Sequence, residues 1–258
     1  MKNIELSSKY DQMYKEGAYA KHFSFIAFPG EKLIIDYMPS WVNLDVLDIG
    51  CGEGSLAAML SFAGAHKVDA VDFSSEAIKK AKSRIHLKNV NFICAEYRTI
   101  KEKYDVVVMN GVLEHLDNPW KELKYIIDNR LINDGVVITT SPSFLNPRGY
   151  IWMALQLLFD IPMSLTDLHF LCPFNFEEFC EINGYNLDLK STDQDWGAGE
   201  RTIIDFKKRL NNALKDANMK NDNIDKFLAW LQKAVQYFPT NEFSGATIAY
   251  KIEKGKHI

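Results

Sequence analysis

The chain has 258 residues, 47% of them hydrophobic and 25% charged, and its 30 lysines and arginines against 34 aspartates and glutamates give a formal net charge of −4. Such a chain is long and apolar enough to bury a core without disulfides, so a disordered protein and a small disulfide-stabilised scaffold are excluded. The mildly acidic balance provides no broad cationic surface, which argues against a nucleic-acid partner.

The chain has four cysteines, none of them in a C-x-x-C pair or at zinc-like spacing from the six histidines: Cys51, Cys94, Cys172 and Cys180. We therefore expect reduced thiols and no metal site. The first residues have no apolar run after their charges, and the most apolar stretch, residues 150–159, has about half the length of a membrane-spanning helix. These features predict a cytoplasmic protein without a membrane span.

Short apolar runs in the first half of the chain are typical of buried strands, and they cover residues 44–49, 67–71, 90–94, 104–109 and 135–140. A turn is expected at 133–135, before the last of them. Helical patterns separate these runs and cover residues 32–38, 54–62, 75–85 and 120–131. Strands that alternate with single helices predict a parallel sheet covered by helices on both faces.

The second half of the chain is less regular. Helical patterns are expected at 150–159 and 176–182, a strand at 185–191, two amphipathic helices at 203–214 and 224–235, and a closing strand at 247–252. No internal repeat or low-complexity tract is present, which predicts one domain with two insertions. The helix at 150–159 is apolar nearly all round, so we expect it to be a lid over the substrate or a contact between two copies in a homodimer.

The segment most informative about chemistry is VLDIGCGEGSLA, residues 46–57, which carries three glycines between a predicted strand and a predicted helix. Gly50 and Gly52 allow backbone torsions and a close ligand approach that a Cβ atom would block. Asp72 ends the second predicted strand, where a carboxylate can accept both hydroxyls of a ribose. Asp48 lies on the first strand. An aspartate at a strand end is more often a cap, but here it occurs together with the glycines and Asp72, which favours a nucleoside site.

The same segment resembles the first motif of class I S-adenosylmethionine-dependent methyltransferases, a hydrophobic run followed by D-x-G-C/T-G-x-G. The resemblance covers about residues 44–140 and continues through Asp72, through Ala95-Glu96 and through MNGVLEHLDNP at 109–119. Beyond residue 141 it thins to HFLCPFNFEEFCEINGY at 169–185. A dinucleotide-dependent dehydrogenase is the weaker alternative, because G-x-G-x-G lacks the final glycine offset of G-x-G-x-x-G.

The resemblance implies an α/β fold with a Rossmann-like, doubly wound, mostly parallel seven-stranded sheet, an antiparallel closing strand, and helical insertions over the active site. It implies a single methyltransferase domain over 1–258. Within that domain, 1–30 would be an N-terminal cap, 44–140 the cofactor-binding core, and 143–175 and 196–240 insertions on the substrate side.

The resemblance also implies S-adenosyl-L-methionine as the cofactor, bound by Tyr14, Asp48, Gly50, Cys51, Gly52, Asp72, Phe73, Ala95, Glu96, Asn110 and Gly111. The methionine moiety would lie along the backbone of the glycines, Asp72 would hold the ribose and Phe73 would cover one face of the adenine. Glu96 could accept from the adenine amino group, and the Asn110 carbonyl from the methionine ammonium. Tyr14 and Tyr19 are expected to close the site, with Tyr19 toward the substrate. The alternative is an aromatic helix face packed on the domain.

Two histidines are candidate general bases. His115 follows Glu114 just beyond the fourth strand, and His169 lies in the segment where related enzymes place substrate-facing residues. For each, a structural histidine is the open alternative. Arg148 stands where a substrate anion could be clamped, and the alternative is a solvated arginine.

These residues predict methyl transfer to a small molecule by in-line displacement, at oxygen rather than nitrogen, with a polar sugar or metabolite precursor as the acceptor. A quinone-type or amine N-methyltransferase is the alternative enzyme. A catalytically inactive, cofactor-binding partner subunit is the alternative outside catalysis.

Overall fold

The structure is a computed structural model that describes residues 3–15, 29–161 and 167–255, apart from the side chains of residues 3–7 and Pro29. Its centre is a seven-stranded sheet in the order β3-β2-β1-β4-β5-β7-β6, and β7 is the one strand that runs antiparallel to its neighbours. The strands are β1 (Asp45–Ile49), β2 (Lys67–Asp72), β3 (Val90–Cys94), β4 (Tyr104–Asn110), β5 (Leu131–Pro142), β6 (Tyr185–Thr192) and β7 (Thr247–Lys254). This arrangement confirms the predicted fold class.

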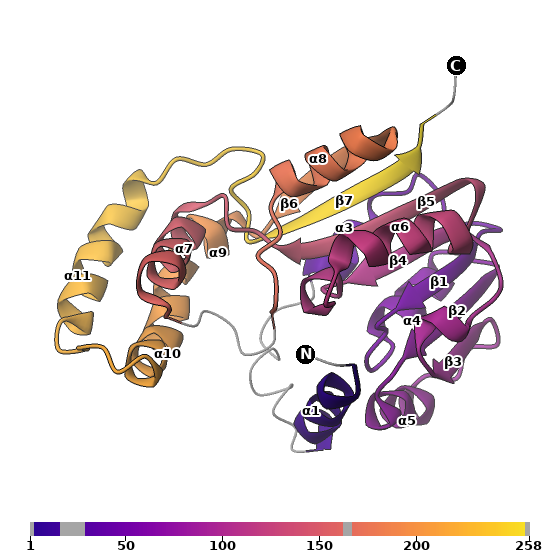
Figure 1. Ribbon diagram of the computed structural model, residues 1–258, viewed down its shortest axis with the longest axis horizontal. Helices are drawn as coiled ribbons and strands as arrows, with labels where there is room; N and C mark the ends of the chain where they lie inside the picture. Colours follow the sequence, from indigo (N-terminus) through magenta and orange to yellow (C-terminus); the bar gives the residue numbers. More distant parts are fainter. Residues whose placement is uncertain (1–2, 16–28, 162–166, 256–258) are drawn as a thin grey trace.

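Helices cover both faces of the sheet (Figure 1). One face packs against α3 (Pro29–Ile35), α4 (Ser55–Phe62) and α5 (Ser75–Arg84), and the other against α6 (Pro119–Arg130) and α8 (Pro173–Asn183). Successive residues of β1 serve opposite cores: Val46 packs with the first group and Leu47 with the second. Because both faces of the sheet are buried, the strands consist largely of consecutive apolar residues.

A third apolar core lies beside the sheet, within the helical group that Figure 1 shows on the left. It is formed by side chains such as Trp152 of α7 (Pro147–Phe159), Phe206 of α10 (Arg201–Asp216) and Leu231 of α11 (Ile224–Ala234), with the short α9 (Gln194–Gly197) nearby. This group departs from the sheet at the carboxyl end of β5, so it stands at the same edge as the glycine-rich turn.

Three details differ from the expectations. The predicted turn at 133–135 is wrong: β5 begins at Leu131, which pairs with Tyr104, and the pairing resumes with Val136 opposite Val106, so the polar residues bulge out of the ladder. The helix expected from 150 starts earlier, at Pro147, because the side chain of Asn146 accepts a hydrogen bond from the Gly149 N–H (2.8 Å) and caps it. Likewise α8 starts at Pro173 rather than 176.

The N-terminal helix α1 (Asn3–Lys15) is not part of either layer. It lies next to the N-terminal end of α5, below the sheet in Figure 1. The described residues also form three short 3-10 turns, which are η1 (Tyr97–Thr99), η2 (Leu113–His115) and η3 (Val235–Tyr237). Within the described ranges, no helix is long and apolar enough to cross a bilayer.

Candidate active site

The glycine-rich turn follows β1 directly and takes a conformation that glycine alone adopts easily. Gly50 and Gly52 have φ values of +72° and +53°. A Cβ atom on Gly50 would lie 2.6 Å from Cγ2 of Val112, so this position has no room for a side chain. The N–H groups of Gly50 and Cys51 both point to the carbonyl of Val71 on β2 (2.8 and 3.2 Å), which ties the turn to the neighbouring strand.

Asp72 ends β2 beside this turn, as the sequence predicts. One carboxylate oxygen accepts a hydrogen bond from the Gly52 N–H (2.9 Å), and the other accepts one from the Ser74 N–H (2.8 Å). Burial raises the pKa of Asp72, and the two backbone donors oppose that effect. Each oxygen keeps a second lone pair, so the group can still accept hydroxyl donors from a ligand.

Asp48 lies on β1 behind the turn and is 1% exposed. Its Oδ2 has no hydrogen-bond partner among the described residues. Burial, together with the charges of Glu31 and Asp72, raises its pKa well above the usual value. A buried polar atom without a hydrogen-bond partner costs free energy, so we expect the Asp48 carboxyl to bind a ligand or to be protonated.

Helix α1 covers the turn. The Tyr14 side chain is buried, and its hydroxyl lies 2.9 Å from the place a Cβ atom of Gly52 would take. The helix is held by α5: Asp11 accepts a hydrogen bond from the hydroxyl of Ser74 (2.5 Å), and Lys80 donates to the backbone carbonyl of Tyr14 (2.8 Å). The structure thus brings Tyr14 to the glycines, as predicted. Tyr19, the other tyrosine assigned to the site, lies outside the described residues.

The ends of the next strands border the same edge. Phe73 follows Asp72 and packs edge-on against Tyr10 of α1, with ring centroids 5.8 Å apart. Ala95 donates its N–H to the carbonyl of Asp72 (3.0 Å), which places the exposed Glu96 beside β2. On the other side, Asn110 ends β4 and its side-chain oxygen accepts a hydrogen bond from the Thr140 hydroxyl (2.6 Å).

The turn after β4 continues this edge. Gly111 has φ +66° and donates its N–H to the carbonyl of Thr140 (3.2 Å). Cys51 lies within the glycine turn itself; its thiol is buried, and burial raises its pKa. The cofactor residues predicted within the described chain therefore gather around one edge of the sheet.

The two candidate bases lie on segments that contact each other. His115 ends η2, its Nδ1 lies 3.4 Å from Oδ1 of Asp167, and its ring contacts that of Tyr10 at 6.0 Å between centroids. His169 is half-buried, and its Nε2 has no hydrogen-bond partner within the described chain. Between them, the backbone carbonyl of Glu114 accepts hydrogen bonds from the N–H groups of Leu168 (2.8 Å) and His169 (3.1 Å).

Glu114 itself is buried, and burial raises the pKa of its carboxyl to about 8. The charge of Asp167 acts in the same direction. Its Oε2 has no partner in the part of the chain that the structure describes. The carboxyl is therefore protonated near neutral pH, and it belongs to the residue that precedes His115 in the chain.

Arg148 is not the solvated arginine that the sequence left as the alternative. Its guanidinium is largely buried within the helical group, 3.9 Å from Oδ2 of Asp205 on α10. Burial lowers its pKa, and the Asp205 charge opposes that effect. The same carboxylate also accepts hydrogen bonds from Trp152 (2.8 Å) and Arg209 (3.0 Å). The structure thus commits Arg148 to an internal ion pair, and its role toward a substrate stays a prediction.

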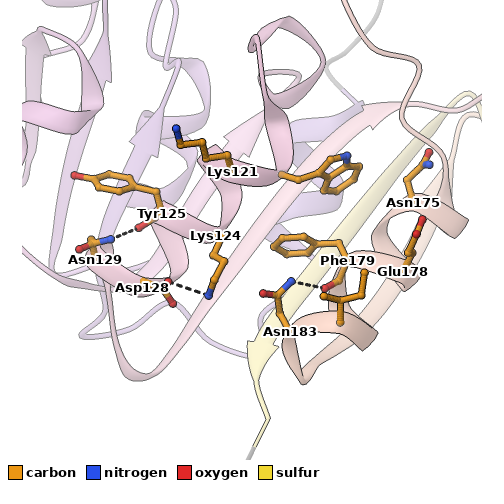
Figure 2. Close-up of a pocket in the computed structure, with 11 residues that line it drawn as sticks. Lys121, Lys124, Tyr125, Asp128, Asn129, Asn175, Glu178, Phe179 and Asn183 are labelled. Carbon is orange, nitrogen blue, oxygen red and sulfur yellow. Dashed lines mark hydrogen bonds and ion pairs between the residues drawn. The ribbon is translucent and has the colours of Figure 1, made fainter.

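A groove of about 620 Å³ lies between α6 and α8. Figure 2 shows side chains that line it. Lys121 and Lys124 come from one helix and Glu178 and Phe179 from the other. Trp120 also lines the groove, and its ring centroid lies 5.4 Å from that of Phe179. No predicted site residue lines this groove. A smaller hollow of about 270 Å³ includes Glu96 and shares Lys121 with the groove.

Several residues of this edge are missing from the sequence prediction, among them Glu31 of α3, Tyr10 of α1 and Asp167. The sequence contains a pattern that could have identified two of them, Glu31 and Tyr10. Glu31 precedes the buried Ile34 by one helical turn and so falls on the buried face, and Tyr10 stands four residues before Tyr14. The described residues contain no group of three or more histidine, cysteine and acidic side chains arranged to hold a metal.

The arrangement fits the cofactor that the sequence implies. Glycine backbone is available for close approach, Asp72 can accept ribose hydroxyls, and the partnerless oxygen of Asp48 is suited to a ligand with donors.

Comparison with known proteins gives the same family. Residues 46–128, about a third of the chain, match the family described as a methyltransferase domain. A malonyl-[acyl-carrier protein] O-methyltransferase of Bacillus anthracis is 34% identical over 103 residues, which are 37% of this chain and 36% of that protein, so the match spans about a third of the relative's length. A ubiquinone biosynthesis O-methyltransferase of Neisseria meningitidis serogroup C is 28% identical over 174 residues, 62% of this chain and 71% of the relative.

Solved structures share the fold at low sequence identity. A Haloferax volcanii methyltransferase in complex with the activator Trm112 has a TM-score of 0.61 at 13% identity and covers 95% of this chain and 97% of its own. The DhpI–SAH complex has a TM-score of 0.58 at 14% identity, with 97% and 96% covered. These findings confirm the resemblance found in the sequence: the chain carries a methyltransferase domain of the class I, S-adenosylmethionine-dependent family.

Proposed function

We propose that the protein is an enzyme that uses S-adenosylmethionine to methylate a hydroxyl oxygen of a small polar molecule, a sugar or metabolite precursor. One observation carries the proposal: the carboxylate of Asp72 is fixed by the Gly52 N–H within a glycine turn that α1 covers. The cytoplasmic location and single-domain organisation inferred from the sequence are part of the same proposal.

When bound, the cofactor supplies a methyl group on a positively charged sulfur, which an aligned nucleophile takes by in-line displacement. The protein's own residues then have three tasks. Asp72 and the glycine turn hold the nucleoside in a fixed place. Tyr14 and α1 exclude water from the carboxyl edge of the sheet. His115, beside Asp167, accepts the proton of the acceptor hydroxyl.

Two arguments support oxygen as the acceptor atom. A hydroxyl must lose its proton during transfer, and His115 and His169 lie on adjoining segments at this edge. Both curated relatives named above are O-methyltransferases by name, although one is matched over only about a third of its length.

A second candidate is a quinone-type acceptor. It is favoured by the relative in ubiquinone biosynthesis and by the apolar side chains that α7 exposes, which are Tyr150, Leu157, Leu158 and Phe159. An apolar acceptor would find a matching surface near the carboxyl end of β5, whereas a polar acceptor would leave these side chains without a role in binding.

Calorimetry with S-adenosylhomocysteine tests cofactor binding. The wild type is expected to bind in the micromolar range, and Asp72→Ala is expected to weaken binding by about 1–3 kcal/mol, because a charged acceptor is lost. Asp134→Ala, at an exposed position of β5, is the matched control and should bind as the wild type does. Lack of binding by the wild type would overturn the proposal.

A screen with labelled cofactor over sugar nucleotides, phosphorylated metabolites and catechol-like quinols then tests the acceptor class. Transfer to a quinol alone would replace the first candidate by the second. Cofactor binding without transfer to any class would favour an inactive partner subunit.

A further inference from the structure

A buried acidic pair lies on the α3 and α4 side of the carboxyl edge. Glu31, in the first turn of α3, is 6% exposed, and its carboxylate accepts a hydrogen bond from the Ser55 hydroxyl (3.0 Å). Asp48 of β1 is a second buried carboxyl, and the charge of Glu31 contributes to the rise of its pKa. Burial raises the pKa of Glu31 to about 7. The molecule therefore holds two carboxyl groups together in a place where ionisation of either is unfavourable.

The groups around this pair supply no compensating charge within the described chain. Ser55 on α4, Asn110 on β4 and Thr140 on β5 are neutral, and Asp72 adds a further negative charge near Asp48. Four lysines belong to α3 or to the elements that pack against it. Lys32 pairs with Asp36, Lys190 lies over the ring of Tyr37, and Lys251 pairs with Glu253. Lys254 ends β7 opposite Tyr185, whereas the carboxyl end of β5 pairs with the other end of β7. A buried pair of this kind needs either protons or a cationic ligand.

The backbone places the pair beside the glycine turn. Ser55 starts α4 directly after Gly54, so the hydrogen bond from Ser55 ties Glu31 to the turn. On the other side, a Cβ atom on Gly30 would lie only 2.4 Å from Oδ1 of Asn110, so glycine there lets α3 approach the end of β4. Glu31 is thus held between the glycine turn and the end of β4, which are the two places assigned to the methionine end of the cofactor.

We propose that Glu31, together with Asp48, forms the subsite that receives the α-ammonium group at the methionine end of the cofactor. The inference rests on the cofactor binding proposed above and adds to it a residue outside the glycine motif. The partnerless Oδ2 of Asp48 and the carboxylate of Glu31 are acceptors, and an ammonium offers three donors and the missing positive charge. Glu31 is then a residue that orients the methionine moiety.

Comparison of two ligands on two proteins tests this assignment. S-adenosylhomocysteine carries the ammonium, and 5′-methylthioadenosine lacks the whole amino-acid part, so only the first should respond to Glu31. Glu31→Gln keeps an oxygen acceptor for Ser55 and removes the charge. By calorimetry on the full chain, this change is expected to weaken S-adenosylhomocysteine binding about 10- to 100-fold and to leave 5′-methylthioadenosine binding unchanged. Asp36→Asn, at the exposed position that directly follows the same helix, is the control.

Equal losses for both ligands, or no loss for either, would overturn the inference while the proposed function stands. No binding of S-adenosylhomocysteine by the wild type would overturn the proposed function and the inference with it. A measurement on the wild type alone covers the case in which Glu31→Gln does not fold. Binding heats near neutral pH, compared in buffers of different ionisation enthalpy, should show proton release, because an ammonium beside the pair favours the ionised carboxyls. Binding without proton release would count against the assignment.

Discussion

The backbone carbonyl of Glu114 accepts a hydrogen bond from the backbone N–H of His169 across 3.1 Å. Since His115 follows Glu114 in the chain, this contact brings both candidate bases to one place, although they belong to segments far apart in sequence. Asp167, next to His115 in space and two residues before His169 in the chain, completes the group. The two histidines can therefore be compared as alternative bases for one acceptor.

His115→Ala is expected to lower kcat by about 10²- to 10⁴-fold at saturating cofactor if His115 takes the proton, because that is the usual contribution of a general base. Asp167→Asn should lower kcat less, since it removes only the group that orients the imidazole. The measurement is the steady-state rate with the acceptor identified by the screen. Residual activity of His115→Ala should rise with pH, as ionisation of the acceptor hydroxyl replaces the base.

His86→Ala serves as the control, because His86 lies on an exposed loop after α5. If His169→Ala loses activity and His115→Ala keeps full activity, His169 rather than His115 is the general base. Unchanged rates in both variants would leave alignment of the reactants as the whole contribution of this site.

Two glycines with similar backbone angles separate backbone strain from steric clash. Gly54 precedes α4 with φ +85°, and a Cβ atom there would lie 2.6 Å from the buried ring of Phe92. Gly184 ends α8 with φ +67°, and nothing lies within 4 Å of its Cβ position. Gly184→Ala is expected to lower the free energy of unfolding by about 1–2 kcal/mol, which is the strain alone.

Gly54→Ala adds the clash and should lower the free energy of unfolding by about 2–5 kcal/mol, since overpacking costs about 1–3 kcal/mol beyond the strain. Urea unfolding of both variants gives the comparison. Equal losses would show that the Phe92 ring moves aside freely.

The strands of this fold could be predicted because each is an apolar run with a helical pattern on either side. The glycine turn and Asp72 could be predicted equally well, because the glycines lie in one short segment and Asp72 follows them at a fixed spacing. The bulge in β5 was not, because Asn133, Asp134 and Gly135 are typical of a turn, and β5 includes them only because Leu131 before them and Val136 after them both pair with β4.

The contacts between distant segments could not be derived from the sequence. Arg148 reads as a solvated or ligand-binding residue, and its burial depends on Asp205 of another helix. For Glu31, the helical spacing from Ile34 indicates only which face it is on, and the environment of its carboxyl arises when α3 packs beside α4. In both cases the local pattern does not identify the partner of the charged group, because that partner lies on another element.

Glu114 should impose a pH dependence on stability. Its carboxyl has a pKa of about 8 in the folded protein against an ordinary value of 4.5, so the folded state binds the proton more tightly than the unfolded state. The free energy of unfolding is therefore expected to fall as the pH rises from about 4.5 to about 8, by at most about 1.4 kcal/mol per pH unit from this group. Above that range its contribution is lost.

Glu114→Gln imitates the protonated carboxyl and should remove this part of the slope. Urea unfolding of the wild type and the variant, at intervals across this range, gives the difference curve, in which the contributions of Glu31 and Asp48 cancel. The variant should match the wild type at the acid end and be the more stable protein at the alkaline end. Parallel curves would show that Glu114 ionises as freely as in the unfolded chain.

Loss of one partner of the Arg148–Asp205 ion pair should destabilise the protein strongly. Asp205 is buried and faces Arg148, Arg209 and the indole N–H of Trp152. Asp205→Ala leaves the buried guanidinium of Arg148 without an anion, and the expected loss is about 3–5 kcal/mol in the free energy of unfolding. Arg209 is partly exposed, so Arg209→Ala should cost about 1 kcal/mol or less.

The double variant Arg148→Met/Asp205→Asn decides whether the pair itself stabilises the protein or whether only its disruption is harmful. Replacement of a buried ion pair by uncharged groups of similar size is often close to neutral, because desolvation of both charges offsets their attraction. We therefore expect the double variant to recover most of the stability lost in Asp205→Ala, measured by urea unfolding. If the double variant does not recover this stability, the interactions of Asp205 with Arg148, Arg209 and Trp152 contribute more to stability than desolvation of the two charges costs. If cofactor-dependent activity also falls while stability recovers, the guanidinium of Arg148 has a role toward the acceptor, as the sequence predicted.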